Sequence, residues 1–338
     1  MKTRAFSFKL PAELIAQEPP AQRGASRLLV LDRASGGLRH ARIADLPSLL
    51  PAGTVLVLND SRVRKARLFG SSPQTGGAIE VLLLERLEGG RWRALAARAR
   101  HRRGRPYLFP GGVQGTVVES AGDSCTVEFV PPVGEDYLER HGHVPLPPYI
   151  RRQDTPADST RYQTVYARHT GSAAAPTAGL HLSEELLAQL SRAGVEVVPV
   201  TLHVGLGTFL PIRSESIEAH AMHAEFYRVP PETALAVNRA LAEGRRVLAV
   251  GTTAVRTLES AGREGEVRAG EGQTSLYITP GYRFRVVGQL LTNFHTPRST
   301  LLVLVSAFAT REVILEAYRL AVAERYRFFS FGDAMLIL

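Results

Sequence analysis

The stretch SEELLAQLSRAGVEVVPVTL, residues 183–202, joins a helix signal directly to a buried-strand signal. Ser183 is a residue type that caps helix N-termini, and Glu184 and Glu185 place negative charge in the first turn. Gly194 ends the helical pattern, and the apolar run after it is typical of a strand buried on both faces. This stretch therefore predicts one helix–strand unit of an α/β sheet.

The same alternation recurs on both sides of that unit. PETALAVNRALAEG (231–244) precedes RVLAVG (246–251), and a further helix is expected from Thr252–Thr253. A helix over roughly 311–326 precedes FFSFGDAMLIL (328–338), which we interpret as a final strand. Buried-strand runs also occur earlier in the chain, in RLLVLDR (27–33) and TVLVLND (54–60). Alternating helices and strands favour an α/β domain.

The middle of the chain has a different pattern. AIEVLLLERL (78–87) and RWRALAAR (91–98) lie on either side of Glu88-Gly89-Gly90, and GTVVES and SCTVEFV flank Ala121-Gly122-Asp123. These are hairpin signals. We expect a larger mixed α/β domain, residues 1–62 and 151–338, with a small β-barrel-like domain inserted at 63–150. The Pro-rich run VPLPPYI (144–150) ends the insert, and the α/β pattern resumes after it.

Basic residues concentrate in this inserted segment. The chain of 338 residues has a formal net charge of +9, and the segment from Arg62 to Arg105 contains twelve basic and three acidic residues. The remainder is balanced, so one structural unit holds the excess. Arginine binds phosphate in a bidentate way, which favours nucleic-acid contact; a solvated face enriched in Arg by codon usage is the alternative. Trp92, Tyr107 and Phe109 lie among these arginines, either to stack on bases or to fill a barrel core.

Several classes of protein are disfavoured. The apolar run Leu301 to Ala309 is far shorter than the about 20 residues that span a bilayer, and the first ten residues lack the pattern of a secretion signal. A cytoplasmic protein is expected. Cys125 is the only cysteine, so an intrachain disulfide and a multi-cysteine metal site are excluded.

Loops after the predicted strands are the candidate site segments, because ligands of α/β sheets bind at the carboxyl ends of strands. HVGLGTF (203–209) offers two glycines for close backbone approach, although a plain strand turn explains it too. GTTAVRTLES (251–260) begins a helix on which Arg256 and Glu259 are spaced i, i+3, and a surface ion pair is the alternative. SAAAPTAGLHLS (172–183) is a small-residue loop.

Histidines add candidates for chemistry. HAMHAE (220–225) permits a metal site on His220, His223 and Glu225, or a histidine base oriented by the carboxylate. The spacing differs from H-E-x-x-H, and no third ligand follows at a set distance. His295 lies in TNFHTPRST, another loop position.

Together these segments resemble the S-adenosylmethionine:tRNA ribosyltransferase-isomerase family of the queuosine pathway, over nearly the whole chain. The resemblance rests on these motifs, in chain order: ELIAQEPPAQRGASRLLVLDR, LNDSRVRKARLFG, TGGAIEVLLLER, GHVPLPPYIRR, RYQTVYA, APTAGLHLS, TLHVGLGTF, HAMHAE, VGTTAVRTLES, YITPGYRF, LLTNFHTPRSTLLVLVSAF and RYRFFSFGDAMLIL. The chain departs from the family pattern at Ser61, Arg64-Lys65, Leu182, Thr296 and Phe331. Phe331 stands where the family usually has Tyr, so no hydroxyl acts there.

The resemblance implies a β-barrel-like domain beside a larger α/β domain. It also implies that S-adenosylmethionine donates a ribosyl group to the 7-aminomethyl-7-deazaguanine at the wobble position of a tRNA, giving epoxyqueuosine and releasing adenine and methionine. S-adenosylmethionine is then a substrate, and neither a metal nor a redox cofactor is expected.

This chemistry needs a base for the C5′ proton beside the sulfonium and donors for the leaving adenine. Our hypothesis gives catalysis to His203, His223 and His295, with Glu225 orienting one of them. Binding of the substrates is assigned to Asn59, Asp60, Arg62, Thr177, Gly179, His181, Gly205, Gly207, Thr208, Thr252, Thr253, Arg256, Glu259 and Asn293. Contact with the tRNA is assigned to Arg98, Arg100, Arg102, Arg103 and Arg105.

Three other functions stay open at this point. A non-catalytic RNA-binding protein would use the basic barrel alone, and a metal-dependent hydrolase would be built on HAMHAE. A methyltransferase would use the same donor but release S-adenosylhomocysteine. We expect a monomer whose partners are the modified tRNA and S-adenosylmethionine, without membrane attachment.

Overall fold

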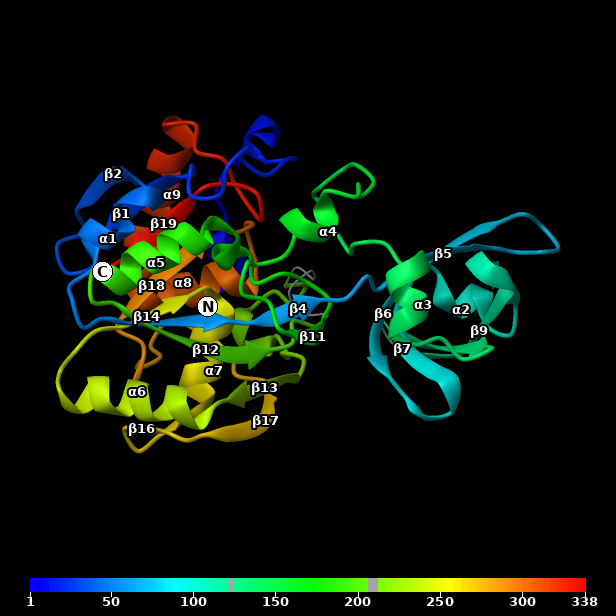
Figure 1. Cartoon of the computed structure of the whole chain (residues 1–338). Coiled ribbons are helices and arrows are strands. Elements are labelled where there is room, and N and C mark those ends of the chain that lie inside the picture. The colour runs from blue at the N-terminus through cyan, green and yellow to red at the C-terminus, as the bar shows by residue number, and fades with distance from the viewer. Residues whose placement is uncertain (122–123, 206–211) are drawn as a thin grey trace.

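A nine-stranded mixed sheet forms the centre of one lobe, and a closed antiparallel barrel of six strands forms the other. The computed structural model describes residues 1–121, 124–205 and 212–338. Figure 1 shows the barrel lobe, coloured cyan to green, standing to one side of the larger lobe. The predicted fold class, a mixed α/β unit with a small barrel, is confirmed.

The large sheet brings distant parts of the chain together. Its strands, in order across the sheet, are β17 (Gly270–Thr274), β13 (Glu225–Val229), β12 (Glu196–Leu202), β3 (Val55–Asn59), β14 (Val247–Val250), β18 (Gln289–Asn293), β19 (Ala334–Ile337), β1 (Arg27–Leu31) and β2 (Leu38–Arg42). The four central strands β12, β3, β14 and β18 are parallel. Their carboxyl ends therefore meet at one edge, where the polar loops follow.

Helices cover both faces of this sheet. On one face, Leu29 and Leu31 of β1 belong to an apolar cluster with side chains of the helices α6 (Pro231–Ala242), α7 (Thr252–Ala261), α8 (Thr300–Ala309) and α9 (Arg311–Ala323). On the other face, Leu28 and Val30 belong to a second cluster with side chains of α1 (Leu46–Leu49) and α5 (Glu184–Arg192). Successive strand residues point to opposite faces, so both faces are apolar and need a cover.

The deciding stretch folds as its sequence predicts. Ser183 caps α5, because its hydroxyl accepts a hydrogen bond from the Leu186 N–H at 3.2 Å. Leu186 and Leu190 of the helix are buried, and β12 follows three residues after Ala193. A cap of this kind stabilises a helix by about 1 kcal/mol.

The smaller lobe is the barrel with two short helices. Its strands are β5 (Arg67–Ser71), β6 (Ala78–Arg86), β7 (Arg91–Ala96), β8 (Pro106–Phe109), β9 (Val113–Ala121) and β10 (Ser124–Val130), and its helices are α2 (Ala99–Arg102) and α3 (Glu135–His141). Trp92, Tyr107 and Phe109 are buried in its core. They pack inside the barrel, so base stacking by these three rings is the wrong alternative.

Short elements lie between and around the two units. They are β4 (Ser61–Val63) paired with β11 (His169–Ser172), α4 (Asp158–Arg161), and the hairpin of β15 (Gly262–Arg263) and β16 (Glu266–Val267). Single 3-10 turns span Thr3–Phe6, Ala12–Leu14, Ile43–Asp45, Glu88–Gly90, Pro110–Gly112, Thr177–His181 and Ile217–Ala219. No helix in the described ranges is long and apolar enough to cross a membrane. The domain limits at 62/63 and 150/151 stay a prediction.

Candidate active site

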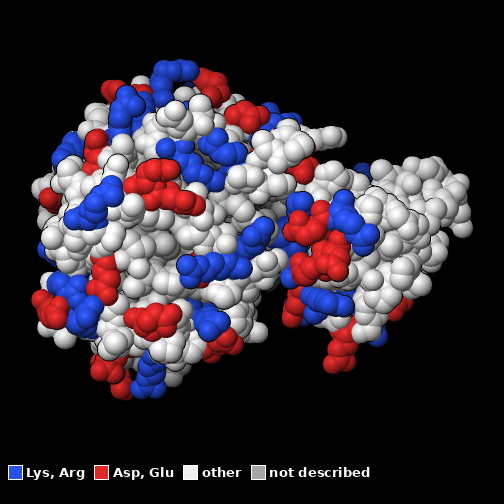
Figure 2. All heavy atoms as spheres, viewed as in Figure 1, with Lys and Arg blue, Asp and Glu red and all other residues white. Residues whose placement is uncertain are grey.

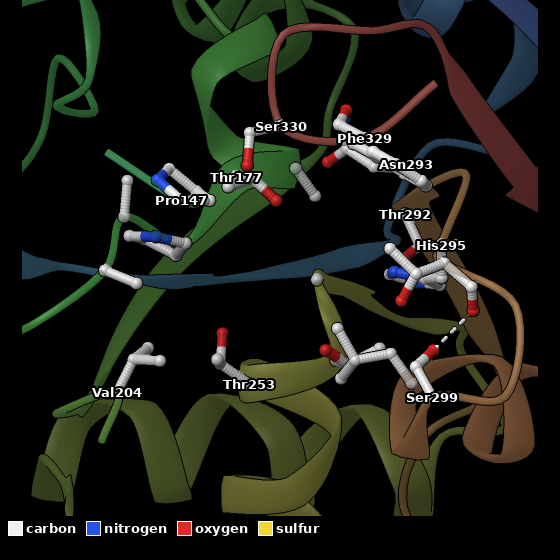
Figure 3. A pocket seen from close by; sticks show the side chains of 18 of the residues that line it. Pro147, Thr177, Val204, Thr253, Thr292, Asn293, His295, Ser299, Phe329 and Ser330 are labelled. Carbon is white, nitrogen blue, oxygen red and sulfur yellow. Dashed lines mark hydrogen bonds between the residues drawn. The ribbon is translucent and has the colours of Figure 1, made fainter. Parts of the chain in front are cut away.

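A cavity of about 240 Å³ opens at the carboxyl edge of the sheet (Figure 3). The end of β18, the turn between β14 and α7, the start of α7 and several loops form its wall. Its polar lining consists of Tyr149, Tyr162, Thr177, Thr252, Thr253, Arg256, Thr292, Asn293, His295, Thr296, Ser299 and Ser330. Six of the predicted site residues, namely Thr177, Thr252, Thr253, Arg256, Asn293 and His295, therefore meet around one space.

The start of α7 supplies the lower wall in Figure 3. Gly251 has φ 87°, a left-handed conformation that glycine adopts without strain, and it turns the chain from β14 into the helix. Thr253 points toward the cavity, and its buried Oγ1 has no hydrogen-bond partner among the described residues. A hydroxyl in this position can donate to a ligand or accept from it.

Arg256 enters the cavity wall as one half of a buried ion pair. Its Nη1 pairs with Glu225 Oε2, and its Nε donates to the Leu276 carbonyl at 3.0 Å. Glu225 Oε1 accepts the Gly205 N–H at 2.8 Å. Both carboxylate oxygens are thus engaged, so Glu225 holds the arginine in place; orientation of a histidine by Glu225 stays a prediction.

Glu259 lies one turn further along α7, away from the cavity. Its carboxylate accepts the backbone N–H groups of Arg285, Val286 and Val287 at 2.9–3.0 Å and the Tyr282 hydroxyl at 3.0 Å. The alternative of a surface ion pair with Arg256 is wrong, because both side chains are buried and each has other partners. Glu259 fixes the chain that leads into β18.

His295 follows β18 and lines the cavity. Its Nε2 lies 2.8 Å from Thr292 Oγ1, and its backbone N–H donates to the Tyr318 hydroxyl at 2.9 Å. Burial lowers the pKa of His295 to about 3, so the ring is neutral at pH 7.

His181 and Gly179 lie behind the cavity wall. The His181 ring contacts Asn293 through Nε2 and Ser26 through Nδ1, each at 3.1 Å, and burial lowers its pKa to about 4. A Cβ on Gly179 would lie 2.0 Å from the Tyr166 hydroxyl, so packing alone requires glycine there.

A separate group of polar residues follows β3 and β12. Asp60 accepts a hydrogen bond from the Thr201 hydroxyl at 2.6 Å and lies 3.6 Å from His169 Nε2. His203 stacks on Phe226 at 5.6 Å between centroids. Burial, together with the charge of Arg64, lowers the pKa of His203. His169 belongs to this group and was not predicted, since a single histidine before a small-residue loop gives no sequence signal.

Asn59 has a structural role at the same edge. Its Nδ2 donates to the Leu202 carbonyl at 3.0 Å, and its Oδ1 accepts the N–H groups of Leu202 at 3.0 Å and Ser61 at 3.1 Å. These bonds tie the end of β3 to the end of β12. Gly205 lies nearby, and its N–H donates to the Glu225 carboxylate. The predicted residues Gly207 and Thr208 lie outside the described part of the chain.

The residues of HAMHAE form no helix, although a 3-10 turn ends just before them at Ala219. Residues 220–224 are irregular, and Glu225 begins β13. His223 is exposed and borders a small cavity on the other side of Arg256. In the described ranges no three His, Cys, Asp or Glu side chains are grouped as metal ligands would be. The metal alternative also needs Glu225, whose oxygens are already engaged.

A second hollow, of about 260 Å³, lies beside the first. Tyr162 borders both, and Arg62, Arg64 and Lys65 line the second together with Glu139 and the start of α4. Figure 2 shows basic side chains on both sides of the gap between the lobes, with acidic ones next to them on the barrel lobe. Arg64 pairs with Glu135 at 2.8 Å and Lys65 with Glu139 at 3.1 Å.

The predicted RNA-contact arginines lie on and around α2 of the barrel. Arg98, Arg100, Arg103 and Arg105 are exposed. Arg102 is half-buried, donates to the Ala78 carbonyl at 3.0 Å and lies over the Tyr107 ring. Four of the five are therefore accessible to a polyanion.

Two loops of the cavity wall were missed from the sequence. Pro147, Pro148 and Tyr149 come from the Pro-rich run that we interpreted as a boundary, and Phe329 and Ser330 come from the segment predicted as a strand. Tyr149 and Ser330 share a hydrogen bond of 2.5 Å between their hydroxyls. The strand itself is only Ala334–Ile337, because the chain turns sharply at Phe329, whose φ is 73°.

The fold defines an α/β protein with a cavity at the carboxyl edge of its sheet and an antiparallel barrel, which carries exposed arginines, beside it. The family model described as "Queuosine biosynthesis protein" matches residues 3–337, and the chain belongs to that family.

Named relatives match over the full length. A protein of Anaeromyxobacter sp. (strain Fw109-5) is 54% identical, with 100% of this chain and 99% of the relative covered. One of Symbiobacterium thermophilum is 54% identical with 100% of both covered. Both are named S-adenosylmethionine:tRNA ribosyltransferase-isomerase. A crystal structure titled S-adenosylmethionine tRNA ribosyltransferase, from Thermotoga maritima, is 38% identical with a TM-score of 0.58, covering 99% of this chain and 100% of that one.

Proposed function

We propose that this chain is an S-adenosylmethionine:tRNA ribosyltransferase-isomerase. It transfers the ribosyl group of S-adenosylmethionine to the 7-aminomethyl-7-deazaguanine at the wobble position of a tRNA and isomerises it, forming epoxyqueuosine and releasing adenine and methionine. The observation that carries the proposal is the identity of 54% over the full length with proteins of that name.

The cavity supports a role in holding the nucleoside of the donor. Its wall combines flat apolar side chains with hydroxyls and an amide, which suits a nucleoside, and it lies where α/β sheets bind such ligands. Thr252, Thr253 and Asn293 contact the nucleoside. Arg256, held by Glu225, sets the shape of one side.

His295 is the candidate catalytic histidine that borders this cavity, and His203 and His223 do not border it. The low pKa of His295 keeps its ring uncharged next to a sulfonium, where a cation would repel the donor. A neutral ring can accept a proton, although a pKa this low makes it a weak base. Substitution of each of the three histidines by Gln, assayed by adenine release, assigns the base; activity within a few-fold of the parent removes a histidine from consideration.

The basic barrel and the hollow lined by Arg62 and Lys65 contact the tRNA. Exposed arginines supply the phosphate contacts that dominate affinity for nucleic acid. The modified base must leave the anticodon stack to reach the donor. We expect the enzyme to act as a monomer in the cytoplasm, where its tRNA is, and to use S-adenosylmethionine as a substrate without a further cofactor.

The test is one incubation of the purified protein with labelled S-adenosylmethionine and tRNA that carries the aminomethyl base. Equal amounts of adenine and methionine, with label in the tRNA, are expected. Release of S-adenosylhomocysteine would identify a methyltransferase, and binding of the tRNA with intact donor would identify a non-catalytic binding protein. Loss of a hydrolytic activity on addition of a chelator would identify the metal-dependent alternative.

A further inference from the structure

We propose that Asn293 reads the base of the donor: its Oδ1 accepts a hydrogen bond from the amino group on C6 of the adenine, and His181 and Ser26 hold the amide in the required sense. This inference rests on the proposed function, since it takes S-adenosylmethionine as the occupant of the cavity. It assigns Asn293 as a residue that determines specificity for the donor's base, and His181 as a residue that positions Asn293.

The contacts of Asn293 fix which way its amide points. Nδ2 lies 3.1 Å from the Phe329 carbonyl, which is always an acceptor, and 3.1 Å from His181 Nε2. The two N–H bonds of the amide therefore have two partners, and Oδ1 must point the other way.

His181 fits this assignment in its tautomer. Burial keeps the ring neutral, with a pKa of about 4, so it has one N–H bond. Because Nε2 accepts from Asn293, the proton is on Nδ1, which donates to the Ser26 hydroxyl at 3.1 Å. In the hydrogen-bonded series Asn293–His181–Ser26, each contact then joins one donor to one acceptor.

Oδ1 is left for a ligand. Asn293 is 2% exposed and lines the cavity, and its Oδ1 has no hydrogen-bond partner among the described residues. A buried acceptor without a partner raises the free energy of the folded protein by about 1–3 kcal/mol, and a ligand that donates a hydrogen bond to it removes this penalty. Figure 3 shows Asn293 on the cavity wall, close to Phe329 and above Thr292.

The wall around Asn293 fits a neutral, flat base that presents an N–H group. Arg256 is the one formally charged side chain among the described lining residues, and Glu225 neutralises it. The wall thus offers no free cation for a phosphate, whereas Tyr149, Phe329 and the prolines offer apolar surface. An adenine amino group donates to Oδ1, but a C6 carbonyl would place two acceptors against each other. Such a mismatch is the kind that a hydrogen-bonding site rejects strongly.

The experiment compares S-adenosylmethionine with its deaminated analogue, which has hypoxanthine in place of adenine, in assays of base release with modified tRNA. The parent enzyme is expected to favour the adenine donor by at least about 100-fold in kcat/KM. Asn293→Ala is expected to lose about 10- to 100-fold with the adenine donor and little with the analogue, so that the preference collapses.

Asn238→Ala is the matched control. Asn238 on α6 also donates to a backbone carbonyl, that of Val267 at 3.0 Å, and accepts the N–H of Val267 at 2.8 Å, but it does not border the cavity. The Asn238→Ala enzyme should be less stable but keep the parent's preference for the adenine donor.

A folded Asn293→Ala enzyme that keeps the full preference for the adenine donor overturns the inference. So does a change confined to the KM for tRNA, which would assign Asn293 to the tRNA base. No base release by the parent enzyme would instead contradict the proposed function.

His181 is tested as the positioning residue. His181→Phe removes the acceptor that fixes the amide, so the preference for adenine should fall at least 10-fold. His181→Gln presents an amide oxygen near the position of Nε2 and should restore most of the preference. Equal preference in both variants and the parent, at matched folded fractions, would overturn the positioning role.

Discussion

Among single residues, Arg256 and Glu225 form a buried pair, and the loss of either partner should lower the free energy of unfolding strongly. The side chains are 7% and 4% exposed, so Arg256→Met leaves a carboxylate without its cation in a site that water hardly reaches. We predict a loss of about 3–5 kcal/mol in the free energy of unfolding, measured by denaturant titration. The double variant with Glu225→Met should lose less than the sum of the single variants.

The exposed pair of Arg319 and Glu316 on α9 gives the control, because it has the same chemistry at 65% and 63% exposure. Arg319→Met should cost less than about 1 kcal/mol. An equally small loss for Arg256→Met would show that the buried pair is solvated in solution.

The two buried histidines at the cavity should make stability fall in mild acid. Burial lowers the pKa of His181 to about 4 and that of His295 to about 3, from 6.5. The unfolded chain therefore binds these protons more strongly, so stability is fully present above about pH 6.5 and is lost as the pH falls toward the folded values. Each histidine contributes a slope of about 1.4 kcal/mol per pH unit in that window.

Denaturant titrations between pH 6 and 4.5 measure this slope. His181→Gln should reduce it by about 1.4 kcal/mol per pH unit relative to the parent, because one of the two protons is no longer taken up on unfolding. His101→Gln, at an exposed position of α2, should leave it unchanged. An unaltered slope in His181→Gln would mean that the ring is already solvated in the folded protein.

At the scale of elements, the packing of the barrel core requires a glycine at position 115. Gly115 lies on β9, where a Cβ would come within 2.5 Å of Phe109 Cε2 and 3.0 Å of Phe129 Cε1. The two rings pack edge to face at 5.4 Å and leave no room. We predict that Gly115→Ala destabilises the barrel by about 1–3 kcal/mol, because a well-packed core resists added volume.

Trp92, the single tryptophan of the chain, is buried in the barrel core, so its fluorescence reports unfolding of this element. Gly288→Ala is the control: its Cβ would lie 3.8 Å from the Val247 carbonyl, an ordinary contact. Gly288→Ala should unfold, by Trp92 fluorescence, at the same denaturant concentration as the parent. If Gly115→Ala also unfolds at the parent's denaturant concentration, the rings of Phe109 and Phe129 can move apart without a cost in free energy.

Elements with a strong local pattern were predictable from the sequence, and contacts between distant segments were not. The helix and strand in 183–202 follow from a cap, a periodicity and an apolar run, all local. Thr252, Thr253 and Arg256 border the cavity and follow the predicted strand 246–251, whereas no strand was predicted before Asn293 and His295, which border it too. Tyr149 and Ser330 meet across 181 residues of sequence, in a Pro-rich run and a sharp turn, where no periodicity points to a cavity.

At the scale of the whole molecule, the separation of the two lobes divides the work between them. The cavity lies at the edge of the large sheet, and the exposed arginines belong to the barrel. The barrel stands to one side of the large lobe (Figure 1). Substitutions on the barrel should therefore change the affinity for tRNA and leave the affinity for the donor unaltered. The salt dependence of binding measures how many phosphates the barrel contacts.

Replacing Arg98, Arg100, Arg103 and Arg105 together by Gln should raise the KM for tRNA at least 10-fold at moderate salt, with the KM for S-adenosylmethionine unchanged. Each lost phosphate contact reduces the slope of log K against log salt by about 0.7–0.9, so the loss of all four contacts reduces it by about 3–4. The matched control replaces Arg39, Arg42, Arg319 and Arg325, which are equally exposed but lie on and after β2 and α9, away from the barrel. It removes the same formal charge, so a purely long-range effect of net charge would weaken binding in both variants alike. If the barrel variant keeps the parent slope, the tRNA binds elsewhere, and the hollow lined by Arg62 and Lys65 becomes the principal contact.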